Sequence, residues 1–192
     1  MLLRDFQGAD QFIRAIDEAV TGEDCCSKAL TDRLRQALCR AIKEKAIALP
    51  PCVYEANPDH YARRELYNSE KHGYSVIAMT WGPHQGTLIH DHSGMWCVEG
   101  VWHGSLEITQ YDLRRQQEDD KFQFEPVGSI QAGAGSAGSL IPPHEYHTIR
   151  NPADDDVAVS VHIYSGKMNC CSVFRPVGDD WYERDMRQLS CD

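Results

Sequence analysis

Three histidines form the set of residues in this sequence with the clearest chemistry. His90 and His92 are separated by one residue, and His147 follows in a later segment. In an extended strand alternate side chains share a face, so His90 and His92 point one way and Asp91 points the other. Such a pair can chelate a metal ion, and a third imidazole from a neighbouring strand completes one face of the coordination sphere. A pair of ordinary surface histidines is the alternative for the His-x-His motif alone.

No glutamate follows this pair at the distance of four or five residues where many β-barrels with such a site have a fourth ligand. Those two positions hold Trp96 and Cys97. Glu99 lies about 6.5 Å beyond Cys97 along an extended strand, so we expect it to be too far away to bind the metal. The expected site has three neutral ligands and three open positions, which suits Fe(II) with a bidentate anionic thiolate and O₂. Zinc with three histidines and a water, acting as a Lewis acid or as a source of hydroxide, is the second possibility.

The composition limits the class of protein. The chain has 192 residues and a formal net charge of −10, from 19 Lys and Arg against 29 Asp and Glu. An acidic chain repels the phosphates of nucleic acids and of anionic membranes, so we expect a small-molecule partner. No apolar run approaches the roughly 18 residues that span a bilayer. The N-terminal segment 1–5 becomes charged too early for a signal peptide, which predicts a cytoplasmic protein.

The eight cysteines are expected to be reduced thiols. They include the adjacent pairs Cys25-Cys26 and Cys170-Cys171, and no Cys-x-x-Cys occurs. A mid-sized chain without a secretion signal does not need a disulfide framework. A structural zinc knuckle is not expected either, because its ligand spacing is missing.

Hydrophobic periodicity predicts the elements that must position the histidines. Apolar residues recur at helical spacing over Ala9–Val20 and Leu30–Leu49, and Pro50-Pro51 ends the second helix. Later, short β-rich runs separated by Gly, Pro, Asp and Asn are typical of an antiparallel sandwich or barrel. The runs are 75–81, 87–92, 96–102, 105–113, 122–127, 139–141, 147–150 and 157–165. The glycine-rich segment 133–138 is interpreted as a tight turn. The length favours one domain, with a helical cap over residues 1–50 and a β-barrel over 51–192.

Several motifs, taken in order, resemble the thiol dioxygenases of the cupin superfamily, and most closely the cysteine dioxygenases. They are Trp81-Gly82, Ile89–His92, Cys97 with Gly104, His147–Asn151 and Ser160–Ser165, in a region from about Tyr61 to Tyr164. The resemblance implies a cupin-type antiparallel β-barrel, or jelly roll, with the N-terminal helices packed outside. It also implies one Fe(II) per chain, bound by His90, His92 and His147. The reaction it implies adds both atoms of O₂ to a thiol and gives cysteine sulfinic acid.

The resemblance assigns a hydrogen-bonded relay to Ser160, His162 and Tyr164. Their i, i+2, i+4 spacing independently places them on one face of one strand. In this relay His162 orients the Tyr164 hydroxyl, and Ser160 fixes the tautomer of the imidazole. Polar residues of an ordinary core strand are the alternative. Burying three such groups costs free energy unless they pair, which favours the relay.

The segment Tyr61-Ala62-Arg63-Arg64 resembles the family's Tyr-x-Arg motif, whose arginine binds the carboxylate of cysteine. A guanidinium matches a planar carboxylate with two parallel hydrogen bonds. The motif selects Arg63, whereas counting back from Trp81 without a gap selects Arg64. Either arginine could instead be a surface charge. Relatives that act on 3-mercaptopropionate usually carry glutamine here, so L-cysteine is the first expected substrate and 3-mercaptopropionate the alternative.

Cys97 matches a cysteine that forms a thioether with the relay tyrosine in the animal enzymes. A cross-link between Cys97 and Tyr164 is therefore a hypothesis, with a free buried thiol as the alternative. His84 and His144 stand where the family usually has glycine, and neither is expected to bind the metal. A non-catalytic cupin that senses a small ligand is the alternative from another functional class, and it leaves the relay without a role.

Overall fold

The computed structural model describes residues 5–23, 26–44, 46–118 and 120–192. Cys25 and the segment 1–4 lie outside the described residues, so the predictions of a reduced Cys25 and of a missing signal peptide are not tested there. The seven cysteines within the described ranges are all free thiols, as expected.

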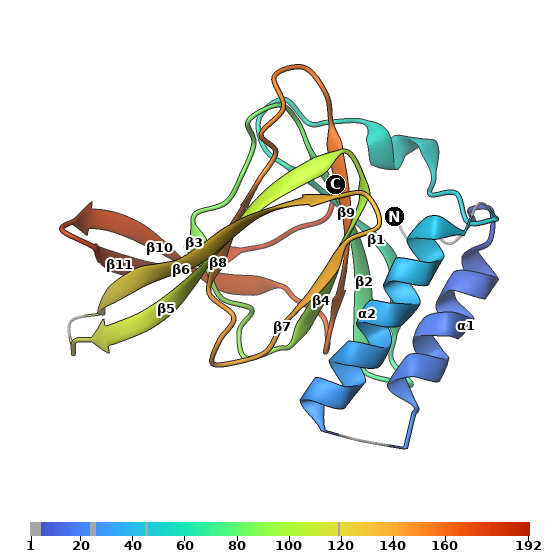
Figure 1. Ribbon diagram of the computed structural model, residues 1–192, viewed down its shortest axis with the longest axis horizontal. Helices are drawn as coiled ribbons and strands as arrows, with labels where there is room; N and C mark the ends of the chain where they lie inside the picture. Colours follow the sequence, from blue (N-terminus) through green and yellow to red (C-terminus); the bar gives the residue numbers. More distant parts are fainter. Residues whose placement is uncertain (1–4, 24–25, 45, 119) are drawn as a thin grey trace.

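Two helices cover one side of the β structure (Figure 1). Helix α1 (Ala9–Val20) has the predicted bounds, and α2 is Ser27–Lys43. Each helix buries one apolar stripe, and α2 packs against strands β4 and β7, which are defined below. The prediction that the second helix runs to Leu49 is wrong. The backbone becomes extended after Lys43, and Ala48 N donates to the carbonyl of Gln7 at 3.0 Å, which brings Ile47 and Leu49 into the core.

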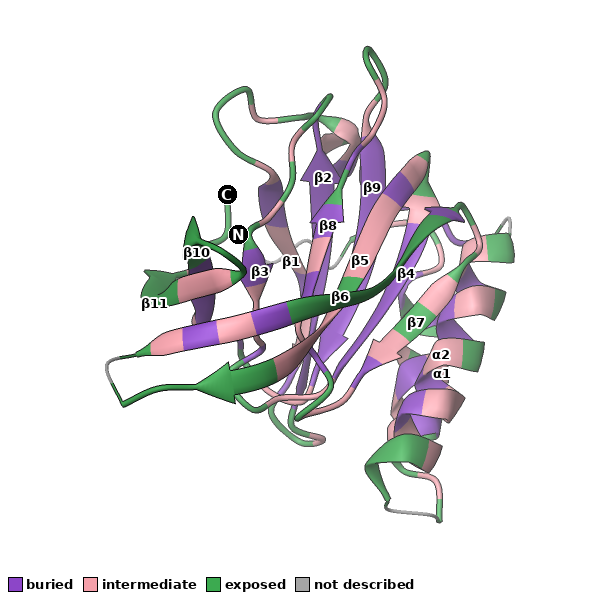
Figure 2. Ribbon diagram, turned by 60° about the vertical axis from the view of Figure 1, so that its left-hand side comes forward, coloured by how far each residue is buried: buried purple, intermediate pink, exposed green. Residues whose placement is uncertain are grey.

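The sheet next to the helices contains the most deeply buried strands. Strands β2 and β9 are buried along their whole lengths, and both are purple in Figure 2. Their side chains pack against the helices on one face and face the barrel interior on the other, which explains why both faces are apolar. The order in the sheet is β1 (Ala62–Ser69), β2 (Tyr74–Trp81), β9 (Ala158–Tyr164), β4 (Cys97–His103) and β7 (Ala137–Leu140).

The remaining strands close into a ring. Its order is β10 (Cys170–Gly178), β11 (Trp181–Gln188), β6 (Lys121–Gly133), β5 (Ser105–Gln116), β8 (His147–Arg150) and β3 (Ile89–His90). A short 3₁₀ helix, η1 (Pro51–Tyr54), leads from the helices into the β structure. All strand pairs are antiparallel. The predicted fold class, mainly antiparallel β with the N-terminal helices packed outside, is confirmed.

Some elements differ from the prediction. Strands β1, β10 and β11 were not predicted, because their charged residues interrupt an apolar alternation and their hydrogen-bond partners lie elsewhere in the chain. Strand β3 is much shorter than the predicted run 87–92. Within 133–138 the turn covers residues 134–136, while the ends of this segment belong to β6 and β7. The division into a cap and a barrel at residue 50 stays a prediction, since the helices and the first sheet share one hydrophobic core.

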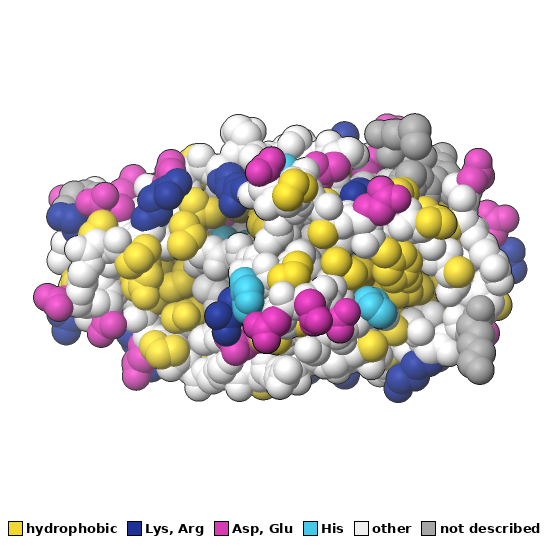
Figure 3. Space-filling view, turned by 90° about the horizontal axis from the view of Figure 1, so that it is seen from above, with side chains coloured by type: hydrophobic (Ala, Val, Ile, Leu, Met, Phe, Trp, Pro, Cys, Tyr) yellow, Lys and Arg dark blue, Asp and Glu magenta, His cyan; other side chains and the backbone are white. Residues whose placement is uncertain are grey.

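The surface reflects the acidic composition. On the face shown in Figure 3, Asp and Glu side chains are spread over the molecule, and Lys and Arg do not form one continuous patch. This face therefore offers no broad basic surface for a polyanion. Within the described ranges, neither helix combines the length and the apolarity needed to cross a membrane.

Candidate metal centre

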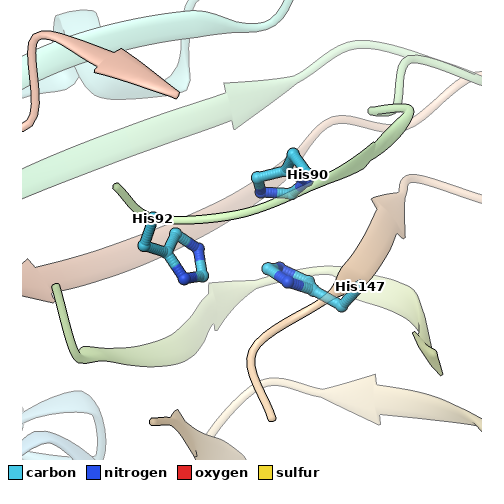
Figure 4. A group of neighbouring side chains, drawn as sticks. All are labelled: His90, His92 and His147. Carbon is cyan, nitrogen blue, oxygen red and sulfur yellow. The ribbon is translucent and has the colours of Figure 1, made fainter. Parts of the chain in front are cut away.

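The three predicted metal ligands converge at one place in the barrel (Figure 4). His90 ends β3 and pairs across the sheet with His147, the first residue of β8, while His92 follows just after β3. One ligand nitrogen from each ring lies within 4.8 Å of those of the other two. Asp91 points away, as predicted, because its Oδ1 accepts a hydrogen bond from the backbone N–H of Ser172 at 2.8 Å.

Backbone carbonyls orient two of these rings. Nδ1 of His90 lies 3.1 Å from the carbonyl oxygen of Leu88, and Nδ1 of His147 lies 3.0 Å from that of Glu145. A carbonyl only accepts, so each Nδ1 donates its hydrogen and each Nε2 is free to bind a metal. Burial lowers the pKa of His90 to about 3 and that of His147 to about 4, and it lowers the pKa of His92 well below its ordinary value. Neutral imidazoles are the form that binds a metal, so the three residues fit one.

Glu99 lies closer to the site than the sequence predicts. Its Oε2 is 3.4 Å from Nδ1 of His162 and 3.7 Å from Nε2 of His147. The expected distance is too long, because the strand rise measures backbone separation only and the long side chain extends from β4 into the barrel. That Glu99 does not bind the metal stays a prediction. Glu99 is not part of the three-histidine group. It forms a second group with Cys97 and His162, whose potential ligand atoms lie within 4.8 Å of one another.

One oxygen of the Glu99 carboxyl, Oε2, is buried without a hydrogen-bond donor. The residue is 6% exposed, and no group in the described part of the chain donates to its Oε2. Burial raises its pKa from 4.5 to about 7. Because the pKa in the folded state exceeds that in the unfolded state, the stability contributed by the protonated form is complete below pH 4.5 and is lost as the pH rises through 7.

Replacing Glu99 with glutamine is expected to stabilise the metal-free protein at pH 8 and to change its stability little at pH 4.5. Glutamine carries no charge to desolvate, and a shift of this size corresponds to a gain on the order of 3 kcal/mol at the higher pH. Urea unfolding of chelator-treated protein at the two pH values measures this change in the free energy of unfolding. The exposed Glu183→Gln is the matched control, and an equal change at both pH values for Glu99→Gln contradicts the prediction.

Ser160, His162 and Tyr164 share the inward face of β9, as their spacing predicts, and Trp81 adds a hydrogen bond that the sequence did not reveal. The Trp81 Nε1–H donates to Ser160 Oγ at 2.9 Å, and this oxygen lies 2.7 Å from Nε2 of His162. An indole only donates, so the Ser160 oxygen accepts from it, and the hydroxyl hydrogen is then free to donate to Nε2 of His162. With these hydrogen bonds from Trp81 through Ser160 to His162, the imidazole hydrogen of His162 lies on Nδ1, which faces Cys97 and Glu99.

The rings of His162 and Tyr164 are neighbours, with centroids 6.0 Å apart, but no hydrogen bond joins these two described side chains. The orientation of the Tyr164 hydroxyl by His162 therefore stays a prediction. Tyr164 lies opposite Cys97 across the sheet, as its cross-strand partner. Burial raises the pKa of Tyr164 well above its ordinary value, so the hydroxyl keeps its proton.

Arg63 and Arg64 face opposite sides of β1. Arg63 is 5% exposed and lines a small cavity together with Tyr61, His90, His162 and Tyr164. Its Nη1 and Nη2 donate to the carbonyl oxygens of Ser190 and Met168 at 3.3 and 3.4 Å, and its Nε has no partner among the described residues. Arg64 donates to Thr80 Oγ1 at 2.9 Å on the other face. The side chain beside the histidines is therefore that of Arg63.

Other residues complete this cavity or lie away from it. Met168, Cys171 and Leu189 also line it, and the sequence analysis missed them because they belong to no spaced motif. His84 is exposed and lies 3.2 Å from the carboxylate of Asp154. His144 is exposed in the turn before β8. Neither of these two histidines joins the three-histidine group.

The fold and the site define a mainly antiparallel β-barrel protein in which three neutral imidazoles, two buried and one half-buried, fit one metal ion. The family model for cysteine dioxygenase type I matches residues 36–176. The chain belongs to this family.

The curated relatives are distant. Cysteine dioxygenase type 1 from Danio rerio is 24% identical over 133 residues, covering 63% of this chain and 64% of the relative. The enzyme of the same name from Rattus norvegicus is 23% identical over 132 residues, covering 64% of each. The chain thus spans 64% of the length of these relatives.

Solved structures with a partly similar fold include two bacterial proteins. A protein with a double-stranded β-helix domain from Klebsiella pneumoniae has a TM-score of 0.47 and 15% identity, covering 64% of this chain and 85% of its own. A cupin superfamily protein from Desulfitobacterium hafniense has a TM-score of 0.44 and 13% identity, covering 62% and 92%.

Proposed function

We propose that this chain is a cytoplasmic thiol dioxygenase that adds both atoms of O₂ to the sulfur of L-cysteine and gives cysteine sulfinic acid. One observation carries the proposal: three neutral imidazoles, two buried and one half-buried, converge beside a cavity that also contains the Arg63 guanidinium. Membership of the family supports the reaction class. His90, His92 and His147 would bind one Fe(II) per chain. Bound there, the ion supplies adjacent open positions for a thiolate and O₂.

Arg63 is proposed to bind the substrate carboxylate. Its guanidinium is already held by two backbone carbonyls, so little side-chain freedom is lost when a carboxylate arrives. The cavity places this cation near His90, on one side of the metal-binding group. A carboxylate fixed at Arg63 therefore directs the thiol of a short amino acid toward the histidines, and this orientation is itself a large part of the expected catalysis.

Tyr164 and His162 are proposed to act on the bound thiol from β9. Tyr164 keeps its proton and lines the same cavity, so its hydroxyl can donate a hydrogen bond to the substrate. His162 is neutral, because burial lowers its pKa well below the ordinary value. Its tautomer is held through Ser160 and Trp81, so the relay positions a fixed N–H and does not carry charge at neutral pH.

A thioether between Cys97 and Tyr164 is also proposed. The two residues are cross-strand partners, and both side chains are buried. Bond formation removes one hydrogen from the thiol and one from the tyrosine ring, with O₂ accepting the two electrons. Intact mass after aerobic turnover of iron-loaded protein should therefore show a form lighter by two hydrogen atoms, which Cys97→Ser lacks. Active protein that retains only the unmodified mass contradicts the cross-link.

Oxygen consumption by iron-loaded protein tests the main proposal. L-Cysteine and 3-mercaptopropionate are supplied in turn, and the sulfinic acid product is identified by mass spectrometry. Faster turnover of L-cysteine is expected, and faster turnover of 3-mercaptopropionate would reassign the substrate. Binding of a thiol without oxygen uptake would instead support a sensor. Metal analysis of the protein as isolated shows whether it carries iron or zinc. Bound zinc would indicate a hydrolase or isomerase.

A further inference from the structure

The segment 189–192, which follows β11, lies along the edge of β1 at Arg63. Strand β1 is at one end of its sheet and pairs with β2 on one side. On the other side, the backbone groups of Arg63 pair with Asp192. The Arg63 N–H donates to Asp192 Oδ2 at 2.8 Å, and the Asp192 N–H donates to the Arg63 carbonyl oxygen at 2.8 Å. One residue thus satisfies both backbone groups of Arg63.

The same segment also contacts the Arg63 guanidinium. The carbonyl oxygen of Ser190 accepts from Nη1 at 3.3 Å, and that of Met168 accepts from Nη2 at 3.4 Å. Leu189 lines the cavity that contains Arg63, and its N–H donates to the carbonyl of Asn169 at 2.8 Å. Carbonyls carry no net charge, so the guanidinium keeps its full positive charge for an anion. The segment therefore holds Arg63 at its backbone and at the end of its side chain.

The second carboxylate oxygen of Asp192 faces the loop before β1. Oδ1 accepts a hydrogen bond from Asn57 Nδ2 at 3.5 Å and lies 3.8 Å from Nε2 of His60. Asp192 itself is exposed, so a smaller side chain at this position leaves no cavity in the core. Any effect of this residue on a bound ligand must therefore pass through its hydrogen bonds.

We propose that Asp192 is a positioning residue for Arg63. Its hydrogen bonds hold the segment 189–192 against β1, and this segment in turn holds the guanidinium in the cavity beside the histidines. A free arginine side chain has many rotamers, and fixing it before the ligand arrives avoids that loss of entropy on binding. The inference rests on the proposed role of Arg63 and identifies what keeps its side chain in place.

Steady-state rates of Asp192→Ala with L-cysteine and with 2-aminoethanethiol test this role. The KM for L-cysteine should rise about tenfold while kcat changes less than about twofold, because the carboxylate contact loosens and the metal-binding group stays intact. The kinetics of 2-aminoethanethiol, which has no carboxylate, should not change. Asp192→Asn keeps a side-chain oxygen that accepts from the Arg63 N–H, so it should restore most of the loss. The exposed Glu183→Ala of β11 is the matched control and should behave as wild type.

A double-mutant cycle separates a positioning role from a general loss of stability. In the Arg63→Gln background, Asp192→Ala should cause no further loss of L-cysteine turnover, because Asp192 acts through Arg63. A further loss as large as that in the wild-type background overturns the proposal. An unchanged KM for L-cysteine in Asp192→Ala, or an equal rise of the KM for 2-aminoethanethiol, also overturns it.

Amide hydrogen exchange gives a readout that does not depend on catalysis. Exchange is followed by mass spectrometry of the peptides that contain Arg63. These peptides should exchange faster in Asp192→Ala than in the wild type, because the Arg63 N–H loses its acceptor, and Glu183→Ala should match the wild type. Unchanged exchange in Asp192→Ala overturns the proposal. If the wild-type protein consumed no oxygen with any thiol, the dioxygenase assignment would fail, and the exchange rates would still decide whether Asp192 holds Arg63.

Discussion

Alanine at position 147 is expected to remove metal binding and, with it, oxygen consumption. His147 is one of the three proposed ligands, and its Nε2 has no substitute at that place among the histidines of the described residues. Substitutions of residues that only orient a metal ligand already lower metal affinity or activity about 10–100-fold. Removal of a ligand should therefore lower activity about 10³-fold or more. Metal content after purification and oxygen-electrode rates measure the two effects.

His144→Ala is the matched control for this experiment. His144 is three positions away, exposed in the turn before β8, and outside the metal-binding group. It should leave both metal content and rate unchanged. Because His147 is 1% exposed, alanine leaves a cavity, so His147→Gln and far-UV circular dichroism distinguish loss of a ligand from loss of the fold. Folded His147 variants that keep iron and activity would remove this residue from the proposed ligand set.

Arg63→Gln is expected to lower kcat/KM for L-cysteine about 100-fold. The substitution removes a charge-assisted, two-point contact with the carboxylate, which corresponds to about 3 kcal/mol of binding in the transition state. The kcat/KM for a thiol without a carboxylate, such as 2-aminoethanethiol, should fall much less in this variant. The ratio of L-cysteine to 3-mercaptopropionate turnover should also fall. Steady-state rates with the three thiols measure these changes.

Arg64→Gln is the control for the carboxylate contact. Its side chain donates to Thr80 and to the carbonyl of Glu55 on the opposite face of β1, so turnover should change little. Equal losses in the Arg63 and Arg64 variants would contradict the assignment of Arg63. Equal losses of turnover with L-cysteine and with 2-aminoethanethiol in Arg63→Gln would also contradict it, because 2-aminoethanethiol has no carboxylate for the guanidinium to bind.

Parts of the fold and of the site could be predicted because they depend on spacing within one element. The helical repeat of residues 9–20 was enough for α1. The alternation of a strand was enough to put His90 and His92 together, with Asp91 turned away. The same alternation placed Ser160, His162 and Tyr164 on one face of β9. These features follow from backbone periods, which local sequence already contains.

Other parts required the folded chain, because they depend on which strands become neighbours. The pairing of β3 with β8 brings His147 to His90, and the pairing of β4 with β9 puts Glu99 opposite His162. The latter contact brings a carboxylate within 3.7 Å of His147, where counting along one strand had excluded it. The indole of Trp81 likewise reaches Ser160 from a different strand.

The contrast has one physical reason. A side chain's face on its own element is set by the dihedral angles of a few consecutive residues, so the spacing of the histidines and of the β9 residues indicated a metal site and a polar row. Distances between elements are set by long-range strand pairing and by the packing of buried side chains. The choice between Arg63 and Arg64 and the acidic neighbour of His147 both depend on those distances.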